Sequence, residues 1–143
     1  MARKILAVTA MDEPIAELAR KTDHTIVAIW AADCAEHVLP YFGEKHPQDT
    51  RPRKAIEACR EWARTGVFRM ADVRNTSLAA HAAARGEKED NAARSAARAA
   101  GQAMATAHVP AHAIAAAMYA ATAVRDAASS PDADSAATRE RDW

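Results

Sequence analysis

The sequence predicts an all-α protein, an antiparallel bundle of five to six helices in a single domain. Apolar residues recur at intervals of three and four along most of the 143-residue chain, which is the period of an amphipathic helix. The stretch 91–128 consists almost entirely of strong helix formers, chiefly alanine. Proline, glycine and short polar clusters separate the periodic segments, as in bundles with short connections. We expect residues 1–128 to form the bundle and the polar residues 129–143 to form a flexible tail.

The charge balance narrows the classes of partner. Lysine and arginine number 19 and aspartate and glutamate number 19, so the formal net charge is zero. This argues against a general nucleic-acid binder, because such affinity depends on excess basic charge. No apolar run approaches the roughly 18 to 20 residues of a membrane span, and the apolar run near the N-terminus is too short for a signal peptide. We therefore expect a cytoplasmic protein with neither nucleic acid nor membrane as a partner.

Two helices are expected before the turn cluster at residues 43–52. Asp12 and Pro14 suit the start of a short helix that ends near residue 20. Asp23 suits the N-cap of the next helix, which Pro40 either ends or follows with a short turn. Residues 4–9 could form a strand or a helix. The stripe at helical spacing along the second helix is Ile26, Ile29, Trp30, Asp33 and His37, widened by Val27, Cys34 and Val38.

Two further helices are expected between the turn cluster and residue 90. Thr50 suits the N-cap of a helix that ends near residue 65, before Gly66. Its apolar side is Ala55, Ile56, Cys59, Trp62 and Ala63. The fourth helix spans about residues 67–85, and its inward stripe is Met70, Val73, Ser77, His81 and Ala84, with Leu78 beside it. Both cysteines of the chain fall among apolar positions, so we expect Cys34 and Cys59 to be buried free thiols.

The alanine-rich stretch 91–128 organises the rest of the bundle. Asp90 suits the N-cap of a fifth helix. Alanine adds little apolar area, so a helix of this kind has to lie close to its neighbours. Pro110 lacks a backbone donor and clashes with the preceding turn, so the stretch is expected to kink or split there, with a last helix extending to about residue 128. Small residues form a ladder along the fifth helix at Ala93, Ala97, Gly101 and Ala105.

Polar residues on faces that should be apolar are the candidates for a site. In one interpretation they line a pocket between helices, where Asp33 orients a histidine and either Arg51 or Arg53 binds a carboxylate or phosphate. In another they form a buried hydrogen-bonded network that fixes helix register, with Asp33 paired to an arginine. The candidate ligand-binding residues are Asp33, His37, Arg53, His81, His108 and His112.

A metal site is a third interpretation of the histidines. His108 and His112 are four residues apart, a spacing that zinc sites use, but the chain has no HExxH or CxxC motif. It also lacks the GxGxxG, P-loop and GxSxG motifs. We therefore expect no metal ligand, no cofactor and no catalytic residue. His24 and His46 fall in caps or loops, where we expect them to be solvated.

The third helix has a second side that is strongly charged. Its simplest interpretation is a solvated face, but charged exposed faces also give fast and selective association with a protein partner. The residues that we expect to contact a partner are Arg51, Glu57, Arg60 and Arg64.

Four pieces of the chain stand in the order typical of one protein family. They are WAADCAEHVLPYF, DTRPRKAIEACREWARTG, SLAAHAAARG and AARAAGQAMATAHVPAHAIAAAMYAATAV. Together they resemble the small bacterial immunity proteins that are associated by gene neighbourhood with polymorphic toxin systems. The resemblance covers about residues 24–125 and leaves out the tail after Arg125. It implies an all-helical domain and, by association, a protein that neutralises a toxin by binding it.

Three hypotheses about function follow from these patterns. The leading hypothesis is an immunity-like binding protein that neutralises a partner protein, a cognate toxin, by direct contact. Its rival is a small-molecule-binding or catalytic bundle with Asp33, His81, His108 and His112 around a shared cavity. The third is that the alanine ladder mediates a homodimer.

Overall fold

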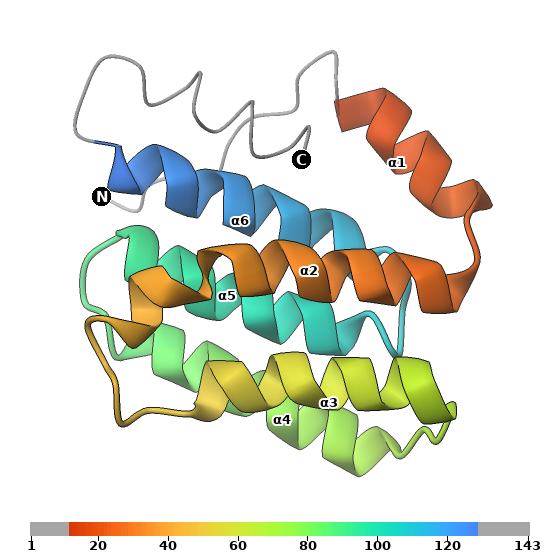
Figure 1. The fold of residues 1–143 in the computed structure, drawn as a ribbon, viewed down its shortest axis with the longest axis horizontal. Helices are drawn as coiled ribbons and strands as arrows, with labels where there is room; N and C mark the ends of the chain where they lie inside the picture. The colour runs from red at the N-terminus through yellow and green to blue at the C-terminus, as the bar shows by residue number, and fades with distance from the viewer. Residues whose placement is uncertain (1–11, 129–143) are drawn as a thin grey trace.

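The computed structural model describes residues 12–128, and all of its regular structure is helical, so the predicted all-α class is confirmed (Figure 1). The segment 4–9 and the tail 129–143 lie outside the described residues. The helices are α1 (Asp12–Lys21), α2 (His24–Gly43), α3 (Arg51–Thr65), α4 (Met70–Arg85), α5 (Ala92–Ala105) and α6 (His112–Ala127).

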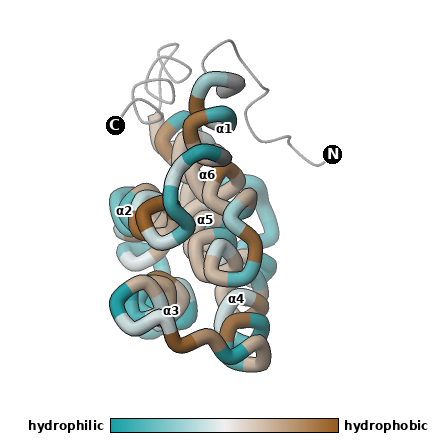
Figure 2. The backbone as a smooth tube through the Cα atoms, turned by 90° about the vertical axis from the view of Figure 1, so that its right-hand side faces the viewer, coloured by the Kyte–Doolittle hydropathy of each residue, from teal (hydrophilic) through white to brown (hydrophobic). Residues whose placement is uncertain are grey.

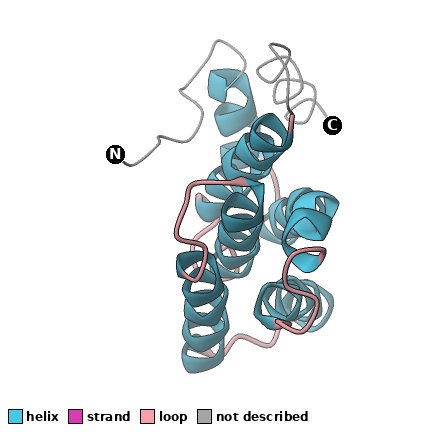
Figure 3. Cartoon of the chain, turned by 90° about the vertical axis from the view of Figure 1, so that its left-hand side faces the viewer, coloured by secondary structure: helices cyan, strands magenta, loops and turns pink. Residues whose placement is uncertain are grey.

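The helices from α2 to α6 form two layers. Consecutive helices run antiparallel from α2 to α6 (Figure 1). Figure 3 shows α4, α5 and α6 stacked in one layer, with α2 and α3 opposite. Helix α5 lies at the centre, because it packs against α2, α3, α4 and α6, and α1 packs against α6. The chain therefore forms one domain around α5.

The composition of α5 explains its central place. Its side chains are small, so four neighbouring helices can approach its backbone closely. The ladder predicted from the sequence is part of this contact: Ala93, Ala97 and Gly101 are buried within the chain and are not free to form a homodimer. The buried residues of α5 are Ala93, Ser95, Ala96, Ala97, Ala99, Ala100, Gly101, Ala103 and Met104.

The inward face of α2 differs from the predicted stripe. Ile26 is 58% exposed and Ile29 is 41% exposed, so these large side chains point outward. Helix α2 packs against the alanine surfaces of α5 and α6, and small side chains allow the closest contact there. The prediction is therefore wrong for Ile26 and Ile29, whereas Val27, Cys34 and Val38, which widened the predicted stripe, are buried. The buried residues of α2 are Val27, Ala28, Ala31, Ala32, Cys34, Ala35, Val38, Leu39 and Phe42.

Helix α2 also continues past Pro40, which the sequence predicted as its end or the start of a separate turn. Pro40 is exposed and lies in the last turn of the helix, so its missing N–H removes only the one hydrogen bond to the carbonyl of residue 36. The Glu44 N–H donates to the Pro40 carbonyl at 2.9 Å. Phe42, only 1% exposed, anchors this turn in the core.

The ends of the other helices agree with the sequence in part. Gly66 follows α3 with φ of 72°, as a left-handed C-terminal residue, and α5 ends five residues before Pro110, so the predicted split is confirmed. Helix α4 begins at Met70 and not near residue 67. These differences are local, and none changes the order of the helices.

One predicted cap is wrong by one residue, and another takes its predicted place without the expected hydrogen bond. Thr50 is the N-cap residue of α3 but makes no side-chain cap bond, and the Asp49 carboxylate accepts from the Arg51 N–H instead. Asn91, not Asp90, accepts from the N–H of Arg94 at the start of α5. The predicted cap of α2 is confirmed, since the Asp23 carboxylate accepts from the N–H of Thr25. All three accepting side chains are Asp or Asn, the preferred residue types for this role.

Candidate functional site

The six expected ligand-binding residues lie in separate parts of the bundle. Asp33 and Arg53 belong to a group of ion pairs between α2 and α3. His81 on α4 and His112 on α6 both contact α5, through Arg98 and Gln102, and they lie close enough to interact electrostatically. The side chains of His37 on α2 and His108 after α5 are exposed. The structure thus brings two of the histidines together, but it does not bring Asp33 to them, because Asp33 faces α3.

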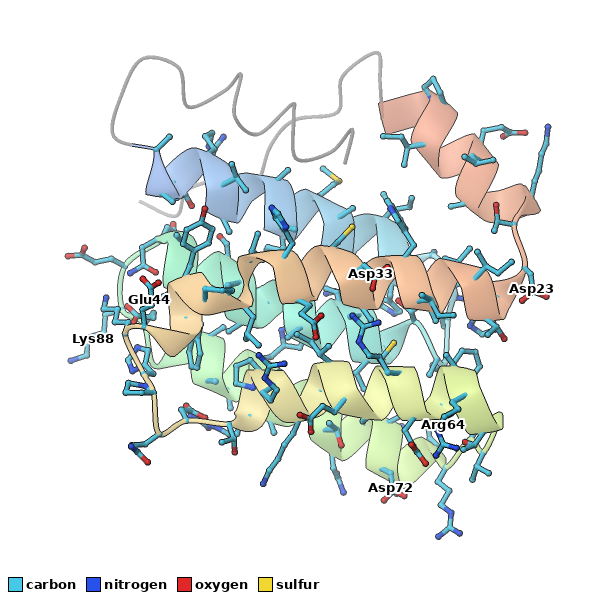
Figure 4. The ribbon with its side chains drawn as sticks, viewed as in Figure 1. Asp23, Asp33, Glu44, Arg64, Asp72 and Lys88 are labelled. Carbon is cyan, nitrogen blue, oxygen red and sulfur yellow. The ribbon has the colours of Figure 1, made fainter. Side chains whose placement is uncertain are left out.

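Charged residues connect α2 to α3 at the surface. Arg60 on α3 places a guanidinium nitrogen 2.9 Å from the Asp33 carboxylate and 3.3 Å from that of Glu36. Arg53 lies 3.5 Å from the other Glu36 oxygen. Figure 4 shows Asp33 on the side of α2 that faces α3. Asp33 therefore pairs with an arginine, as one interpretation predicted, but at a surface position where its side chain is 45% exposed.

The outer side of α3 carries further charges that are held in place by neighbours. Arg51 donates to both carboxylate oxygens of Asp49, at 2.9 and 2.7 Å. These hydrogen bonds lower the pKa of Asp49 below its ordinary value. Arg64 donates to Glu61 at 2.6 Å. The fourth expected partner-contact residue, Glu57, is exposed and has no ion pair within the described residues.

A pocket of about 350 Å³ lies beside the connection between α3 and α4. The connection beside it is apolar and exposed: Val67 is 61% exposed, Phe68 40% and Met70 37% (Figure 2). The ring of His108 stacks on Phe68 with centroids 6.0 Å apart. None of the six expected ligand-binding residues lines this pocket. Its lining residues are Ala58, Glu61, Trp62, Thr65, Val67, Arg69, Asp72, Val73, Thr76 and Met104.

A polar cluster lies between α4, α5 and α6. One guanidinium nitrogen of Arg98 is 2.9 Å from Nδ1 of His81. On the next turn of α5, the Gln102 side-chain oxygen is 2.7 Å from Nδ1 of His112. Burial lowers the pKa of His81 to about 4, helped by the positive charges of Arg98 and Arg85. His81 is therefore neutral at neutral pH, and its Nδ1 accepts the hydrogen bond from Arg98.

Two members of this cluster were not predicted from the sequence. They are Arg98 and Gln102, which stand four residues apart as polar residues in an alanine helix. That spacing places both side chains on one face of α5, and they could have been predicted from this pattern. Their partners lie on other helices, so the spacing alone did not indicate what they would contact.

A second buried group also escaped the sequence analysis. Glu87, only 6% exposed, lies between α4 and α5 and accepts hydrogen bonds from Lys45 at 2.8 Å, from Asn91 at 2.8 Å and from His46. Burial alone raises the pKa of Glu87, but these hydrogen bonds outweigh it and hold the pKa at about 2. Glu87 thus ties the loop after α2 to the loop after α4.

Both histidines that were expected to be solvated have protein partners. His46 binds Glu87, and Nε2 of His24 lies 2.5 Å from the carbonyl oxygen of Thr106. The ring of His24 also packs against Trp62 with centroids 4.7 Å apart. These histidines hold loops and helix ends together.

Among residues 12–128, no group of three or more histidine, cysteine, aspartate or glutamate side chains is arranged to hold a metal ion. Cys34 and Cys59 are buried free thiols, as predicted, and burial raises the pKa of Cys59 to about 12. Within the same residues, no helix combines the length and apolar character needed to cross a bilayer.

Comparison with known proteins gives one match. No curated protein and no solved structure matched the chain. A model of the family described as "Imm-5 like putative immunity protein" matches residues 17–143. This match extends past both ends of the stretch 24–125 that carried the resemblance, and it includes the tail that the resemblance left out. Because it covers most of the sequence, the chain belongs to the family described as "Imm-5 like putative immunity protein".

Proposed function

We propose that this protein neutralises a partner protein, a toxin, by direct contact through one face of α3. This contact face consists of the charged side of α3, with Arg51, Glu57, Arg60 and Arg64, and the apolar pocket at the C-terminal end of that helix. Family membership supports the immunity role. The observation that carries the choice of face is that an exposed charged surface leads directly into an apolar pocket.

The charged part of the contact face suits selective recognition. It carries charges of both signs, and several are oriented by neighbours: Arg60 by Asp33 and Glu36, and Arg64 by Glu61. Oriented side chains lose less conformational freedom on binding than free ones. A surface with a fixed pattern of charge also accelerates encounter and excludes partners whose charges do not match.

The pocket can bury an apolar side chain of the partner, which a charged surface alone cannot do. Most of the binding energy of protein complexes comes from a few large apolar or aromatic side chains seated in pockets, surrounded by a polar rim. Trp62, Val73 and Met104 line the pocket, while Glu61 and Asp72 also contribute to its wall. We infer that an apolar side chain of the partner enters here.

Co-expression with the toxin-like products of neighbouring genes tests this proposal. We expect the protein to restore growth against one of them and to form a complex that can be purified. The double reversal of Glu57→Arg and Arg64→Glu should weaken that complex about tenfold or more, because opposed charges would meet like charges.

The control is Lys88→Glu, a charge reversal at an exposed position at the end of the bundle away from Arg64 (Figure 4). It should leave binding unchanged. If no product of a neighbouring gene is bound or inhibited, the proposed role is wrong. If the complex forms but tolerates the double reversal on α3 as well as it tolerates Lys88→Glu, the choice of face is wrong.

A further inference from the structure

Three arginines gather on one side of the α4–α5–α6 layer. Arg94 and Arg98 stand one turn apart on α5, and Arg85 lies close enough on α4 to lower the pKa of Arg98. Burial contributes most to that lowering, and nearby Tyr119 opposes it. Arg94 and Arg98 are half-buried, whereas Arg85 is exposed. Like charges held together at a partly buried site destabilise the fold unless an opposite charge joins them.

Among residues 12–128, little negative charge joins these arginines. Arg94 pairs with Asp90 at 3.1 Å. In the part of the chain that the structure describes, Arg98 and Arg85 have no carboxylate partner within ion-pair distance. The guanidinium of Arg98 is held instead by neutral His81, which accepts one of its hydrogen bonds and leaves its positive charge uncompensated. The cluster therefore has unused hydrogen-bond donors and an excess of positive charge.

Gly101 of α5 leaves room for the ring of His81. A Cβ atom built on Gly101 would lie 2.7 Å from Nε2 of His81 and 2.9 Å from two of its ring carbons. The ring can therefore occupy this position only because residue 101 has no side chain. His112, bonded to Gln102 one turn further along the same face of α5, lies close enough to His81 to lower its pKa. Arg98 is thus oriented by a fixed partner, which is the arrangement that a binding site needs.

We propose that Arg85, Arg94 and Arg98 form a binding site for a small phosphate-type oxyanion. Arg98 supplies a planar fork of N–H donors that matches phosphate oxygens, and the other two arginines add charge. A phosphate group with close to two negative charges compensates the cluster better than a carboxylate with one. His81 acts as a positioning residue, because it touches Arg98 and not the anion. This site is separate from the contact face on α3, so either proposal can fail while the other holds.

Titration with inorganic phosphate tests the site. We expect saturable binding by isothermal titration calorimetry, accompanied by amide chemical-shift changes along α5, and weaker binding of acetate. Arg98→Gln should reduce phosphate affinity about tenfold or more, because a hydrogen bond to a charged group is lost. The matched control is Arg60→Gln, which removes an arginine that already has Asp33 and Glu36 as partners. It should leave phosphate affinity unchanged.

The positioning role of His81 has its own test. His81→Asn keeps an acceptor near the place of Nδ1 and should retain most of the phosphate affinity, whereas His81→Leu removes the acceptor and should weaken binding. Thermal unfolding of each variant shows whether it still folds, and Arg98→Gln tests the site independently if His81→Leu does not. The proposal is overturned if phosphate gives no saturable signal, if acetate binds as well as phosphate, or if Arg98→Gln and Arg60→Gln bind phosphate equally.

Discussion

The packing of His81 against Gly101 shows how one missing side chain decides the position of another. The imidazole lies where a Cβ atom of residue 101 would be, and it is held there by Arg98. The sequence marked both positions: His81 as a polar residue on an inward stripe and Gly101 as a rung of the small-residue ladder. That the two would meet depends on how α4 lies against α5, which no local pattern specifies.

Gly101→Ala should destabilise the protein by about 1–3 kcal/mol, because the new methyl group overlaps the ring of His81 and forces it to move. Urea or thermal unfolding measures this loss. We also expect the pKa of His81, observed by NMR, to rise from about 4 as the ring leaves its buried position.

Gly43→Ala is the control for the glycine change itself. Gly43 is also in a helix, but a Cβ atom there would have nothing within 4 Å and the backbone is not left-handed. It should leave the stability unchanged or raise it slightly, because alanine favours the helix. Equal effects of the two substitutions would show that the contact with His81 does not constrain residue 101.

Glu87 gives the stability a defined pH dependence. Its pKa in the folded protein is about 2, below the ordinary value of 4.5, so the folded state binds the proton less readily than the unfolded state does. The ionised carboxylate therefore contributes its full stabilisation above about pH 4.5 and loses it as the pH falls towards 2. Glu87→Gln should lower the free energy of unfolding at pH 7 by about 2 kcal/mol, since hydrogen bonds to a charged group are weakened.

Chemical denaturation of both proteins from pH 7 down to pH 2 checks this prediction. The difference in stability between the wild type and Glu87→Gln should shrink across that window. Glu89→Gln, at an exposed position in the same loop, is the control and should show no such difference. A gap between wild type and Glu87→Gln that is independent of pH would contradict the assignment.

At the level of the helices, local signals located the elements well and their first residues less well. Every expected helix between residues 12 and 128 is present, because propensity, spacing and breaking residues act within a few positions of each other. Caps are harder to predict when two suitable residues are adjacent. Asp49 and Thr50, or Asp90 and Asn91, can each serve, and the geometry of the incoming chain decides between them.

Asn91→Ala should destabilise the protein by about 1 kcal/mol, because its side chain accepts from the N–H of Arg94 at the start of α5 and also donates to Glu87. Thr50→Ala is the matched control: Thr50 also occupies an N-cap position but makes no cap hydrogen bond. It should change the free energy of unfolding by less than about 0.5 kcal/mol. Thermal unfolding distinguishes the two, and an equal loss would show that the observed cap bond is not what stabilises α5.

Across the whole molecule, the close packing of the bundle depends on the small side chains of α5. Four helices pack on it, and its alanines are fully buried at several positions, including Ala100 at 0% exposure. This also explains the error on α2, where alanines face inward and Ile26 and Ile29 face outward. Hydrophobicity ranks isoleucine above alanine, but a surface of alanines leaves no room for a large side chain.

Ala100→Leu should therefore destabilise the protein by about 1–3 kcal/mol, because the larger side chain pushes neighbouring helices away from α5. Ala71→Leu introduces the same side chain at an exposed position on α4 and should stay within about 0.5 kcal/mol of the wild type. Denaturant unfolding of both variants measures the contrast. If Ala100→Leu is tolerated as well as Ala71→Leu, close packing around α5 is not what stabilises the bundle.

The sequence by itself determined the helical class, the positions of the helices and the alanine-rich character of the central one. These features follow from interactions between residues a few positions apart, so they can be read from a linear pattern. Only the tertiary structure decided which side of α2 faces inward, that Asp33 pairs with Arg60 and not with a histidine, and that Arg98 meets His81. The partners in these pairs are 17 or more positions apart in the chain, and their meeting depends on the rotation and spacing of whole helices, which close packing around α5 sets.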